Sequence, residues 1–452
     1  MIVLRAATLI DGTGAPPVIA DVQIEGDRIV AIGPALVAPP GAVELDLRGT
    51  WLVPGLIDTH VHLMNVPGQP WLAPDPVESL RVAQLASFVA CGVTTVLDVG
   101  TVPERMASVR AAIDAGAPAP TVYGLGEIVG PAGGYPSVFE PAMEGVGSVD
   151  ALRALLDRNV SNGAIGTKVT FERGFGGAPL PLFDEGMRAA VRAESEARDL
   201  PVFVHAMTPE EFLPALELGP RAFLHGPERP DPAVTAAIAG SGAVVVPTLT
   251  VYDAPLLALD RRTLDDPWVR AVVPAELLAA GLDHPTAIRS RHALGEMVMP
   301  GAPDWAAGIG VTARAIARRK LSRAIAAARD LHEAGVPLAL GTDSGTWPVI
   351  HTQFAGVAAV RELEYLAQAG LTPDQVLAAG TTTPAALLGL AHELGTVEIG
   401  KVADLVVLGS DPLRDPLAWR TTKWVVHDGS VRTPAEWMAV GGSTLPPGDG
   451  RR

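Results

Sequence analysis

The chain has 452 residues, a net charge of −16 at pH 7 and a single cysteine, Cys91. This acidity argues against binding to the phosphate backbone of nucleic acids, which needs clustered Lys and Arg, and the lone cysteine excludes an internal disulfide. We find neither a signal peptide nor the roughly 18 to 20 consecutive apolar residues of a membrane-spanning helix, so we predict a cytoplasmic protein without nucleic acid or membrane partners.

The two ends of the chain carry short β-prone runs separated by turn residues. The runs in the first fifty residues are Met1–Leu4, Asp21–Glu25, Arg28–Ile32 and Val43–Leu47. Their spacing by Gly, Asp and Pro predicts an antiparallel meander. The pattern returns in Ala403–Leu408 and Trp424–His427, and Asp428-Gly429 predicts a hairpin turn after the last of these runs.

Between the two ends, strand-like and helical stretches alternate. The strand candidates are Leu56–His62, Thr94–Val99, Thr121–Leu125, Thr167–Phe171, Val202–His205, Ala222–His225, Ala243–Leu249 and Leu338–Asp343. The helical examples are Val77–Ala90, Val149–Asn159, Gly186–Ala197 and Ala313–Ala334. This order predicts an α/β protein with a (β/α)8 TIM-like barrel rather than an open sheet. We expect the long segments Glu127–Gly147 and Val251–Thr312 to lie over the active-site face as loops.

The first strand candidate of the barrel ends on two histidines, in the sequence Pro-Gly-Leu-Ile-Asp-Thr-His-Val-His. Alternate side chains of a strand share a face, so His60 and His62 leave the same side about 7 Å apart along the strand. Two such imidazoles can begin a divalent metal site, although a pair of histidines packed in a core would show the same spacing.

Four later segments also end an apolar run on, or close to, a residue that can bind metal. They end at Lys168, His205, His225 and Asp343. Reactive residues of a TIM barrel gather at the carboxyl ends of its strands, so this repetition favours a shared site over coincidental packing.

The order His-x-His, Lys, His, His, Asp resembles that of the metal-dependent amidohydrolase superfamily, in particular its imidazolonepropionase and prolidase-like dipeptidase branch. The segment Leu394–Leu408 is similar to the closing segment of that family. The resemblance implies that residues 1–54 and 395–452 form one small β-sandwich beside a barrel of residues 55–394. The residues alone leave open whether the two ends pair.

The resemblance also implies a binuclear metal centre. His60, His62 and Asp343 would hold one ion and His205 with His225 the other, with Zn²⁺ preferred. Two dications about 3.5 to 4 Å apart repel by roughly 19 kcal/mol at an effective dielectric of about 20, so bridging anions are needed. In the family, a lysine at the position of Lys168 reacts with carbon dioxide and becomes a bridging carbamate. The alternative is an ordinary Lys168 ammonium, paired with a carboxylate beside a single ion.

The function implied is hydrolysis of an amide or peptide carbon–nitrogen bond in a small or dipeptide-like substrate. A metal-activated hydroxide would attack, with Asp343 as the proton shuttle. Tyr135, Tyr252 and His351 are candidate substrate contacts, and a core, lid or structural role is the alternative for each. One alternative function is a cyclic-amide hydrolase similar to imidazolonepropionase. Another is a non-catalytic metal- or ligand-binding barrel. A homo-oligomer is left open.

Overall fold

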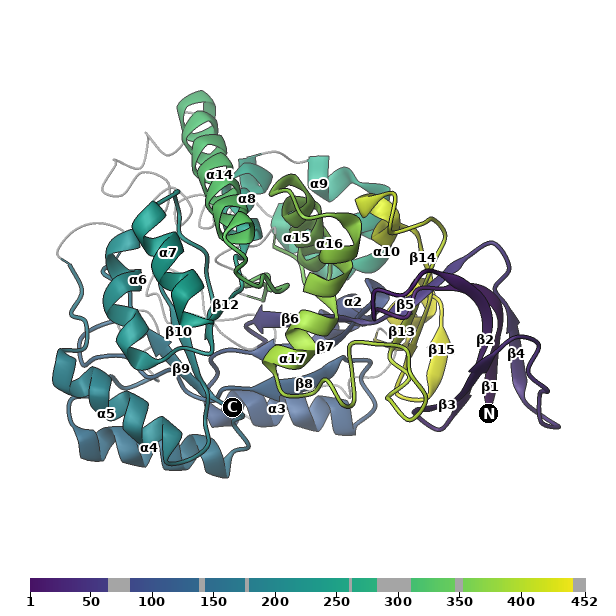
Figure 1. The fold of residues 1–452 in the computed structure, drawn as a ribbon, viewed down its shortest axis with the longest axis horizontal. Coiled ribbons are helices and arrows are strands. Elements are labelled where there is room, and N and C mark those ends of the chain that lie inside the picture. Colours follow the sequence, from purple (N-terminus) through teal and green to yellow (C-terminus); the bar gives the residue numbers. More distant parts are fainter. Residues whose placement is uncertain are drawn as a thin grey trace.

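The computed structural model of the chain describes residues 1–63, 82–137, 143–174, 179–259, 262–282, 310–345 and 353–441. Strands from the N-terminal and C-terminal segments of the chain share one eight-stranded sheet (Figure 1). Its neighbours in order are β15 (Ser430–Arg432), β14 (Thr422–His427), β13 (Leu405–Leu408), β5 (Trp51–Pro54), β1 (Ile2–Leu9), β2 (Val18–Glu25) and β3 (Arg28–Gly33), and β4 (Val43–Asp46) pairs with β1.

The terminal sheet confirms the pairing of the two ends and corrects one part of the meander. Strands β1, β2 and β3 are antiparallel neighbours, but β4 runs parallel to β1. Residues 34–42 connect β3 to β4, which lies beside β1 and not beside β3. A tight hairpin would place β4 antiparallel to β3, so this longer connection crosses over to reach β1. The two-layered sandwich and the division of the chain at residues 54 and 395 stay predictions.

The hairpin predicted at Asp428-Gly429 is confirmed. Strands β14 and β15 are antiparallel, with His427 opposite Ser430, so the two residues between them form the whole loop. Both have positive φ, +47° at Asp428 and +64° at Gly429. Such values suit a two-residue turn whose twist matches that of the strands, and Asp-Gly adopts them at little cost.

The central strands form two parallel sheets. One contains β6 (Leu56–Val61), β7 (Val93–Asp98) and β8 (Thr121–Gly124). The other contains β9 (Thr167–Thr170), β10 (Val202–His205), β11 (Ala222–Phe223) and β12 (Val244–Val245). These bounds confirm seven of the strand candidates in position, although β11 and β12 are shorter than predicted and Leu249, predicted to end a strand, begins a helix.

Single bridges join the two central sheets on both sides. On one side, Val129 pairs with Val169 of β9. On the other, the predicted strand at residues 338–343 supplies bridges instead of a named strand, since Leu338 pairs with Val245 and Ser344 pairs with Val61. The described residues therefore form a TIM-barrel-like α/β arrangement. A fully closed eight-stranded barrel stays a prediction.

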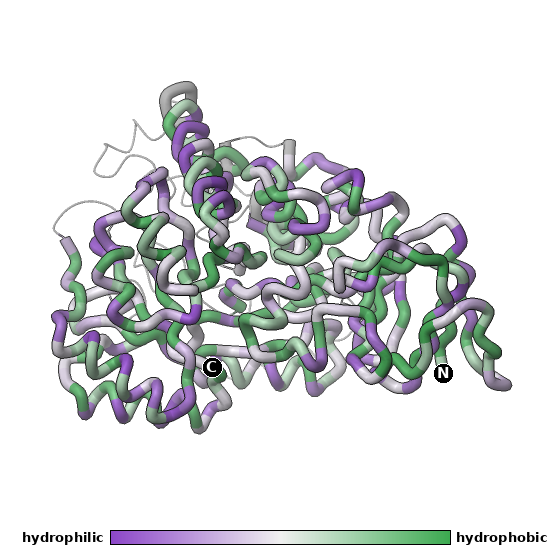
Figure 2. The backbone as a smooth tube through the Cα atoms, viewed as in Figure 1, coloured by the Kyte–Doolittle hydropathy of each residue, from purple (hydrophilic) through white to green (hydrophobic). Residues whose placement is uncertain are grey.

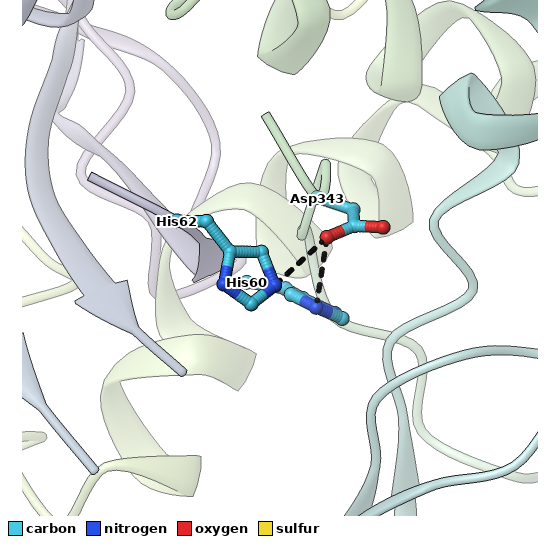
Figure 3. A group of neighbouring side chains, drawn as sticks. All are labelled: His60, His62 and Asp343. Atoms are coloured by element: carbon cyan, nitrogen blue, oxygen red, sulfur yellow. Dashed lines mark ion pairs between the residues drawn. The ribbon is translucent and has the colours of Figure 1, made fainter. Parts of the chain in front are cut away.

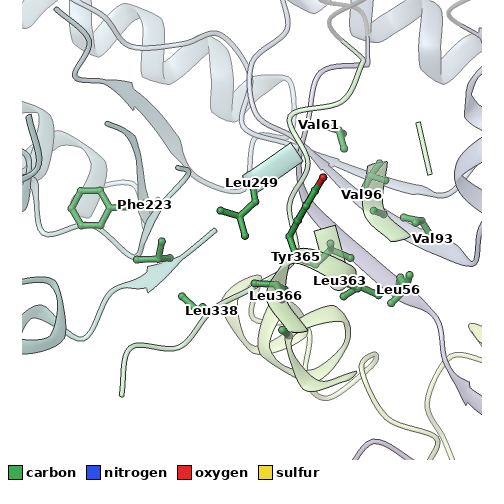
Figure 4. Packing of buried hydrophobic residues seen from close by; sticks show 14 of the residues in the cluster. Leu56, Val61, Val93, Val96, Phe223, Leu249, Leu338, Leu363, Tyr365 and Leu366 are labelled. Carbon is green, nitrogen blue, oxygen red and sulfur yellow. The ribbon is translucent and has the colours of Figure 1, made fainter. Parts of the chain in front are cut away.

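Alternation along these strands separates an inner from an outer apolar layer. Leu97 of β7, Phe203 of β10, Ala222 of β11 and Ala339 belong to one buried cluster, so strands of both sheets share an interior. Their sequence neighbours, such as Val96 and Val204, belong to a larger cluster that includes residues of the surrounding helices. Figure 4 shows part of this larger cluster, where Leu363 and Leu366 lie near Leu56 and Leu338. The period of two thus packs both faces of the strands.

Helices cover the outside of the central sheets. They are α2 (Leu85–Ala90), α3 (Pro103–Asp114), α4 (Val149–Ser161), α5 (Glu185–Glu196), α6 (Pro209–Ala215), α7 (Pro232–Ser241), α8 (Leu249–Leu259), α9 (Arg262–Asp265), α10 (Pro267–Val272), α11 (Ala275–Leu282), α14 (Gly310–Glu333), α15 (Val357–Gln368), α16 (Pro373–Gly380) and α17 (Thr382–Leu387), with α18 (Pro434–Gly441) near the terminal sheet and two 3-10 turns, η1 (Leu216–Leu218) and η2 (Pro416–Thr421). Hydrophilic and hydrophobic positions alternate along the outer helices α4 and α5 (Figure 2). No helix among the described residues is long and apolar enough to cross a membrane.

The predicted helices at residues 149–159, 186–197 and 313–334 are confirmed as α4, α5 and α14. For Val77–Ala90 the later part is confirmed as α2, and residues 77–81 lie outside the described residues. The segment from Val251 to Thr312 was predicted wrongly as a loop, because its described part is largely helical in α8 to α11 and in the start of α14. Apolar residues such as Leu264, Val269 and Leu277 are buried there, so this segment adds to the core.

Candidate metal centre

The two histidines of the first central strand lie side by side in the interior. His60 belongs to β6, and His62 follows the last residue of that strand. Their side chains are 1% and 6% exposed, and their ring centroids are 5.6 Å apart. The two-residue spacing therefore places both imidazoles in one buried site, as strand geometry predicts.

Asp343 reaches these histidines because two glycines let its segment approach β6 closely. A Cβ on Gly341 would lie 2.8 Å from the Cβ of His60, and one on Gly345 would lie 1.8 Å from the carbonyl oxygen of His62. The Asp343 N–H donates to the carbonyl of His60, and Asp343 itself has a φ of +59°. A non-glycine residue with this conformation carries strain that the surrounding packing must offset, and such residues cluster at functional sites.

The Asp343 carboxylate lies between the two imidazoles (Figure 3). Its Oδ1 atom is 3.3 Å from Nε2 of His60 and 3.1 Å from Nε2 of His62. Ligand atoms of all three residues lie within 4.8 Å of one another. Two imidazole nitrogens and a carboxylate oxygen at this spacing suit a borderline divalent ion such as Zn²⁺.

Electrostatics favour a neutral His60 imidazole beside an ionised Asp343 carboxylate. Burial lowers the pKa of His60 to about 3, although Asp343 acts in the opposite direction. Burial raises the pKa of Asp343, but the charges and hydrogen bonds of His60 and His62 outweigh it and bring the pKa well below its usual value. Nδ1 of His60 is buried and has no hydrogen-bond partner among the described residues. Neutral imidazole and ionised carboxylate are the forms of these side chains that can bind a cation.

The other two predicted histidines extend the same site. His205 ends β10, and His225 lies two residues beyond β11. Ring centroids are 4.8 Å apart for His60 and His225 and 4.5 Å apart for His205 and His225. The four imidazoles thus form a continuous row of ring contacts that begins at His62.

Lys168 of β9 faces the same interior. It is 1% exposed and lies directly opposite Phe203, two residues before His205, in the pairing of β9 with β10. Burial lowers its pKa to about 7, and the charge of Asp343 partly opposes this shift. The charge of Lys168 also helps to lower the pKa of His60 and that of His225. All six residues predicted as metal-binding side chains therefore meet in one region.

The predicted substrate contacts have different outcomes. The ring of Tyr135 stacks on His205, with centroids 5.2 Å apart and planes inclined by 20°. Tyr252 lies in α8, is buried, and its hydroxyl has no hydrogen-bond partner among the described residues. His351 lies outside the described residues. A role in substrate binding stays a prediction for all three.

Several polar residues that support the site were not predicted. Asp58 accepts hydrogen bonds from the amides of His60 and Thr342 and from the Thr342 hydroxyl, so it joins the segment of His60 and His62 to that of Asp343. Burial raises the pKa of Asp58 to about 7. The Asp98 carboxylate accepts a hydrogen bond from the amide of Leu63, the residue next to His62. The acidic residue in Ile-Asp-Thr-His was the one signal in the sequence that could have identified Asp58.

Thr248 and Glu172 contact the second pair of histidines directly. Oγ1 of Thr248 is 2.6 Å from Nδ1 of His225. Thr248 has a φ of +48°, which is a marked outlier for a β-branched residue. Oε2 of Glu172 is 3.2 Å from Nε2 of His205. Neither residue shows its role in the sequence, because both partners come from other strands.

Glu362 fixes the start of α8 beside the site. Its two carboxylate oxygens accept from the amides of Leu249 and Thr250, each at 2.8 Å. The side chain of Glu362 is fully buried, and burial raises its pKa to about 8, while these hydrogen bonds act in the opposite direction. A carboxylate at a helix N-terminus satisfies amides that have no partner within the helix.

We expect Glu362 to make stability depend on pH. Its folded-state pKa is raised from 4.5 to about 8, so the stability it contributes is present below pH 4.5 and is lost as the pH rises toward about 8. Glu362→Gln has no proton to release. The melting temperature of the wild type relative to this variant should therefore fall by at least about 2 °C between about pH 5 and about pH 8.5. Calorimetry of the wild type and Glu362→Gln at both pH values measures this difference in melting temperature, with the exposed Glu185→Gln as control. A difference in melting temperature that does not change with pH would contradict the prediction.

Comparisons with known proteins agree with this architecture. The family model described as "Amidohydrolase family" matches residues 51–432. A solved structure of a Xaa-Pro dipeptidase with bound methionine superposes with a TM-score of 0.71 at 20% identity, over 96% of this chain and 99% of the other. At this identity the likeness supports the fold alone.

Two curated relatives match over shorter segments. The N-acyl-D-aspartate deacylase of Alcaligenes xylosoxydans xylosoxydans is 32% identical over 181 residues, which are 36% of this chain and 35% of the relative. The imidazolonepropionase of Symbiobacterium thermophilum is 38% identical over 87 residues, or 19% of each chain. The chain thus matches about a third or less of the length of these relatives.

Proposed function

This chain belongs to the amidohydrolase family, and on that premise we propose that it hydrolyses carbon–nitrogen bonds of small amides with the help of bound divalent metal. The observation that carries the proposal is the convergence of two buried histidines and Asp343, with their ligand atoms within 4.8 Å of one another. A structural cluster would not need an ionised carboxylate between two imidazoles and a buried ring nitrogen without a partner.

We propose that two ions bind, with Zn²⁺ as the first candidate. His60, His62 and Asp343 would hold one, and His205 with His225 would hold the other. The compact group of His60, His62 and Asp343 supports the first of these sites, and the ring contact between His205 and His225 supports the second. When bound, such ions lower the pKa of water and polarise a substrate carbonyl.

Asp343 is the group we assign to proton transfer. Its carboxylate lies between two predicted ligand imidazoles, and its side chain keeps 16% exposure, so it can contact a substrate. The neighbouring imidazoles hold its pKa well below the usual value, so Asp343 is ionised at neutral pH, and the ionised carboxylate is the form that we propose accepts a proton from the attacking water. It then returns that proton to the leaving nitrogen.

The substrate class is proposed as N-acyl amino acids or dipeptides. The name of the deacylase relative specifies an N-acyl amino acid, and that of the solved dipeptidase specifies a dipeptide. A cyclic amide is the second candidate, favoured by the match to imidazolonepropionase. A non-catalytic barrel is the alternative of another class, and the intact set of six metal-binding side chains argues against it.

A screen of N-acyl amino acids, dipeptides and lactams against the metal-loaded protein tests this function. We expect turnover of at least one amide class, loss of that activity after chelation, and recovery when Zn²⁺ is returned. Metal analysis of the same preparation should give about two ions per chain. Full activity without metal would rule out the proposed chemistry, and a folded protein that neither binds metal nor turns over any amide would favour the non-catalytic alternative.

A further inference from the structure

We propose that Glu172 is a positioning residue that holds His205 in one tautomer and so decides which of its ring nitrogens is free to bind metal. The inference rests on the proposed metal centre. Glu172 lies just beyond β9, on the segment that follows Lys168, and its side chain is 4% exposed. No sequence signal marks it, and no other part of the proposed function uses it.

Both oxygens of the Glu172 carboxylate are engaged. Oε1 accepts a hydrogen bond of 2.6 Å from the amide of Gly174, and Oε2 lies 3.2 Å from Nε2 of His205. The contact with Gly174 is local, because the donating amide lies only two residues after Glu172. The carboxylate is therefore anchored to its own loop while its second oxygen faces the imidazole.

An ionised carboxylate can only accept hydrogen bonds. In the neutral imidazole of His205 the proton must therefore be on Nε2, which leaves the lone pair on Nδ1. The ring is also fixed in orientation, because Tyr135 stacks on one face and the ring of His225 meets it at 81°. Carboxylates that bind the second nitrogen of a ligand histidine fix its tautomer and raise its basicity.

His225 provides an internal contrast. Its Nδ1 contacts the hydroxyl of Thr248, which can either donate or accept and so does not impose a tautomer. Of the two partners, Glu172 is therefore the one whose charge selects a single tautomer of the histidine that it contacts. Its removal should affect the ion held by His205 much more than the ion held by His60 and His62.

The rival interpretation is that Glu172 itself binds the metal. The separation of 3.2 Å from His205 resembles the 3.1 and 3.3 Å between Asp343 and its two histidines. However, Glu172 does not join His205 and His225 in a compact group, whereas His60, His62 and Asp343 form such a group among the described residues. One of its oxygens is also already held by Gly174. These two observations favour the positioning role.

Metal titration of three variants separates the interpretations. The affinities of the full-length protein for two Zn²⁺ ions are measured by competition with a chromophoric chelator, together with the bound metal content. Glu172→Ala should weaken the second ion by about 10- to 100-fold and change the first by less than about threefold. Glu172→Gln should recover part of the loss, because its amide oxygen still accepts from Nε2–H. Glu185→Ala, an exposed carboxylate at the start of α5, should match the wild type.

Each other result counts against the proposal. Equal losses in Glu172→Gln and Glu172→Ala would make Glu172 a ligand, and unchanged affinity in Glu172→Ala would remove its role. Nitrogen chemical shifts of labelled histidine in the metal-free protein, assigned with His205→Gln, give a readout that needs no metal. His205 should be protonated at Nε2 in the wild type and lose that preference in Glu172→Ala. A wild type that binds no metal would end the proposed function, and this spectrum would still test Glu172.

Discussion

Asp343→Asn is expected to lower kcat by about 10² to 10⁴, while KM for the best amide of the screen changes little. The amide side chain keeps an oxygen that can contact a cation but lacks a basic carboxylate. The position of Asp343 between two imidazoles, at 3.3 and 3.1 Å, is the reason to expect that the loss falls on proton transfer rather than on substrate binding.

Steady-state kinetics and metal content must be measured on the same sample of Asp343→Asn, because loss of metal would lower kcat for another reason. Asp231→Asn is the matched control, since it makes the same chemical change at the N-cap of α7, where an Asn can still accept from the amides of Ala233 and Val234. Its kcat should be close to that of the wild type. If Asp343→Asn keeps two ions and near-normal kcat around neutral pH, the proton must move through another group.

Lys168→Met is expected to cost about one bound ion per chain and to lower kcat/KM by at least about 100-fold, because a second cation contributes several kcal/mol to transition-state stabilisation. Burial brings the pKa of Lys168 to about 7, so much of the amine is uncharged near neutral pH. The uncharged nitrogen can add to carbon dioxide, with loss of a proton, to give an anionic carbamate. That anion would reduce the repulsion between two dications, whereas an ammonium would increase it.

Metal analysis and kinetics with added short carboxylic acids test this role of Lys168. Acetate or propionate should partly restore activity to Lys168→Ala by occupying the bridging position, and should not affect Lys401→Met, a change outside the central sheets. Native mass measurements should show one added carbon dioxide on the wild type that is lost in acid. An unmodified ammonium at Lys168 in a metal-loaded crystal would refute the carbamate, and two ions with full activity in Lys168→Met would refute the bridge.

The ends of the central strands were predictable because strand periodicity and chain order are local properties. The two-residue spacing of His60 and His62 fixes their common side in any strand, and the apolar run ending on His205 marks the end of β10. Lys168 is instead the second residue of β9, so its prediction as the last residue of a strand was wrong. The Asp428-Gly429 turn was predictable for a similar reason, since positive φ at both positions depends on those two residues alone.

Tertiary structure alone decided how close these residues come and what supports them. The approach of Asp343 to His60 depends on Gly341, whose lack of a side chain matters only against a strand far away in the sequence. The contact of Glu172 with His205 likewise joins residues of neighbouring strands. The sequence by itself therefore identified the candidate metal-binding side chains and placed His62 and His205 at the ends of their strands. Distances and burial were decided by packing, because they depend on partners that no local pattern specifies.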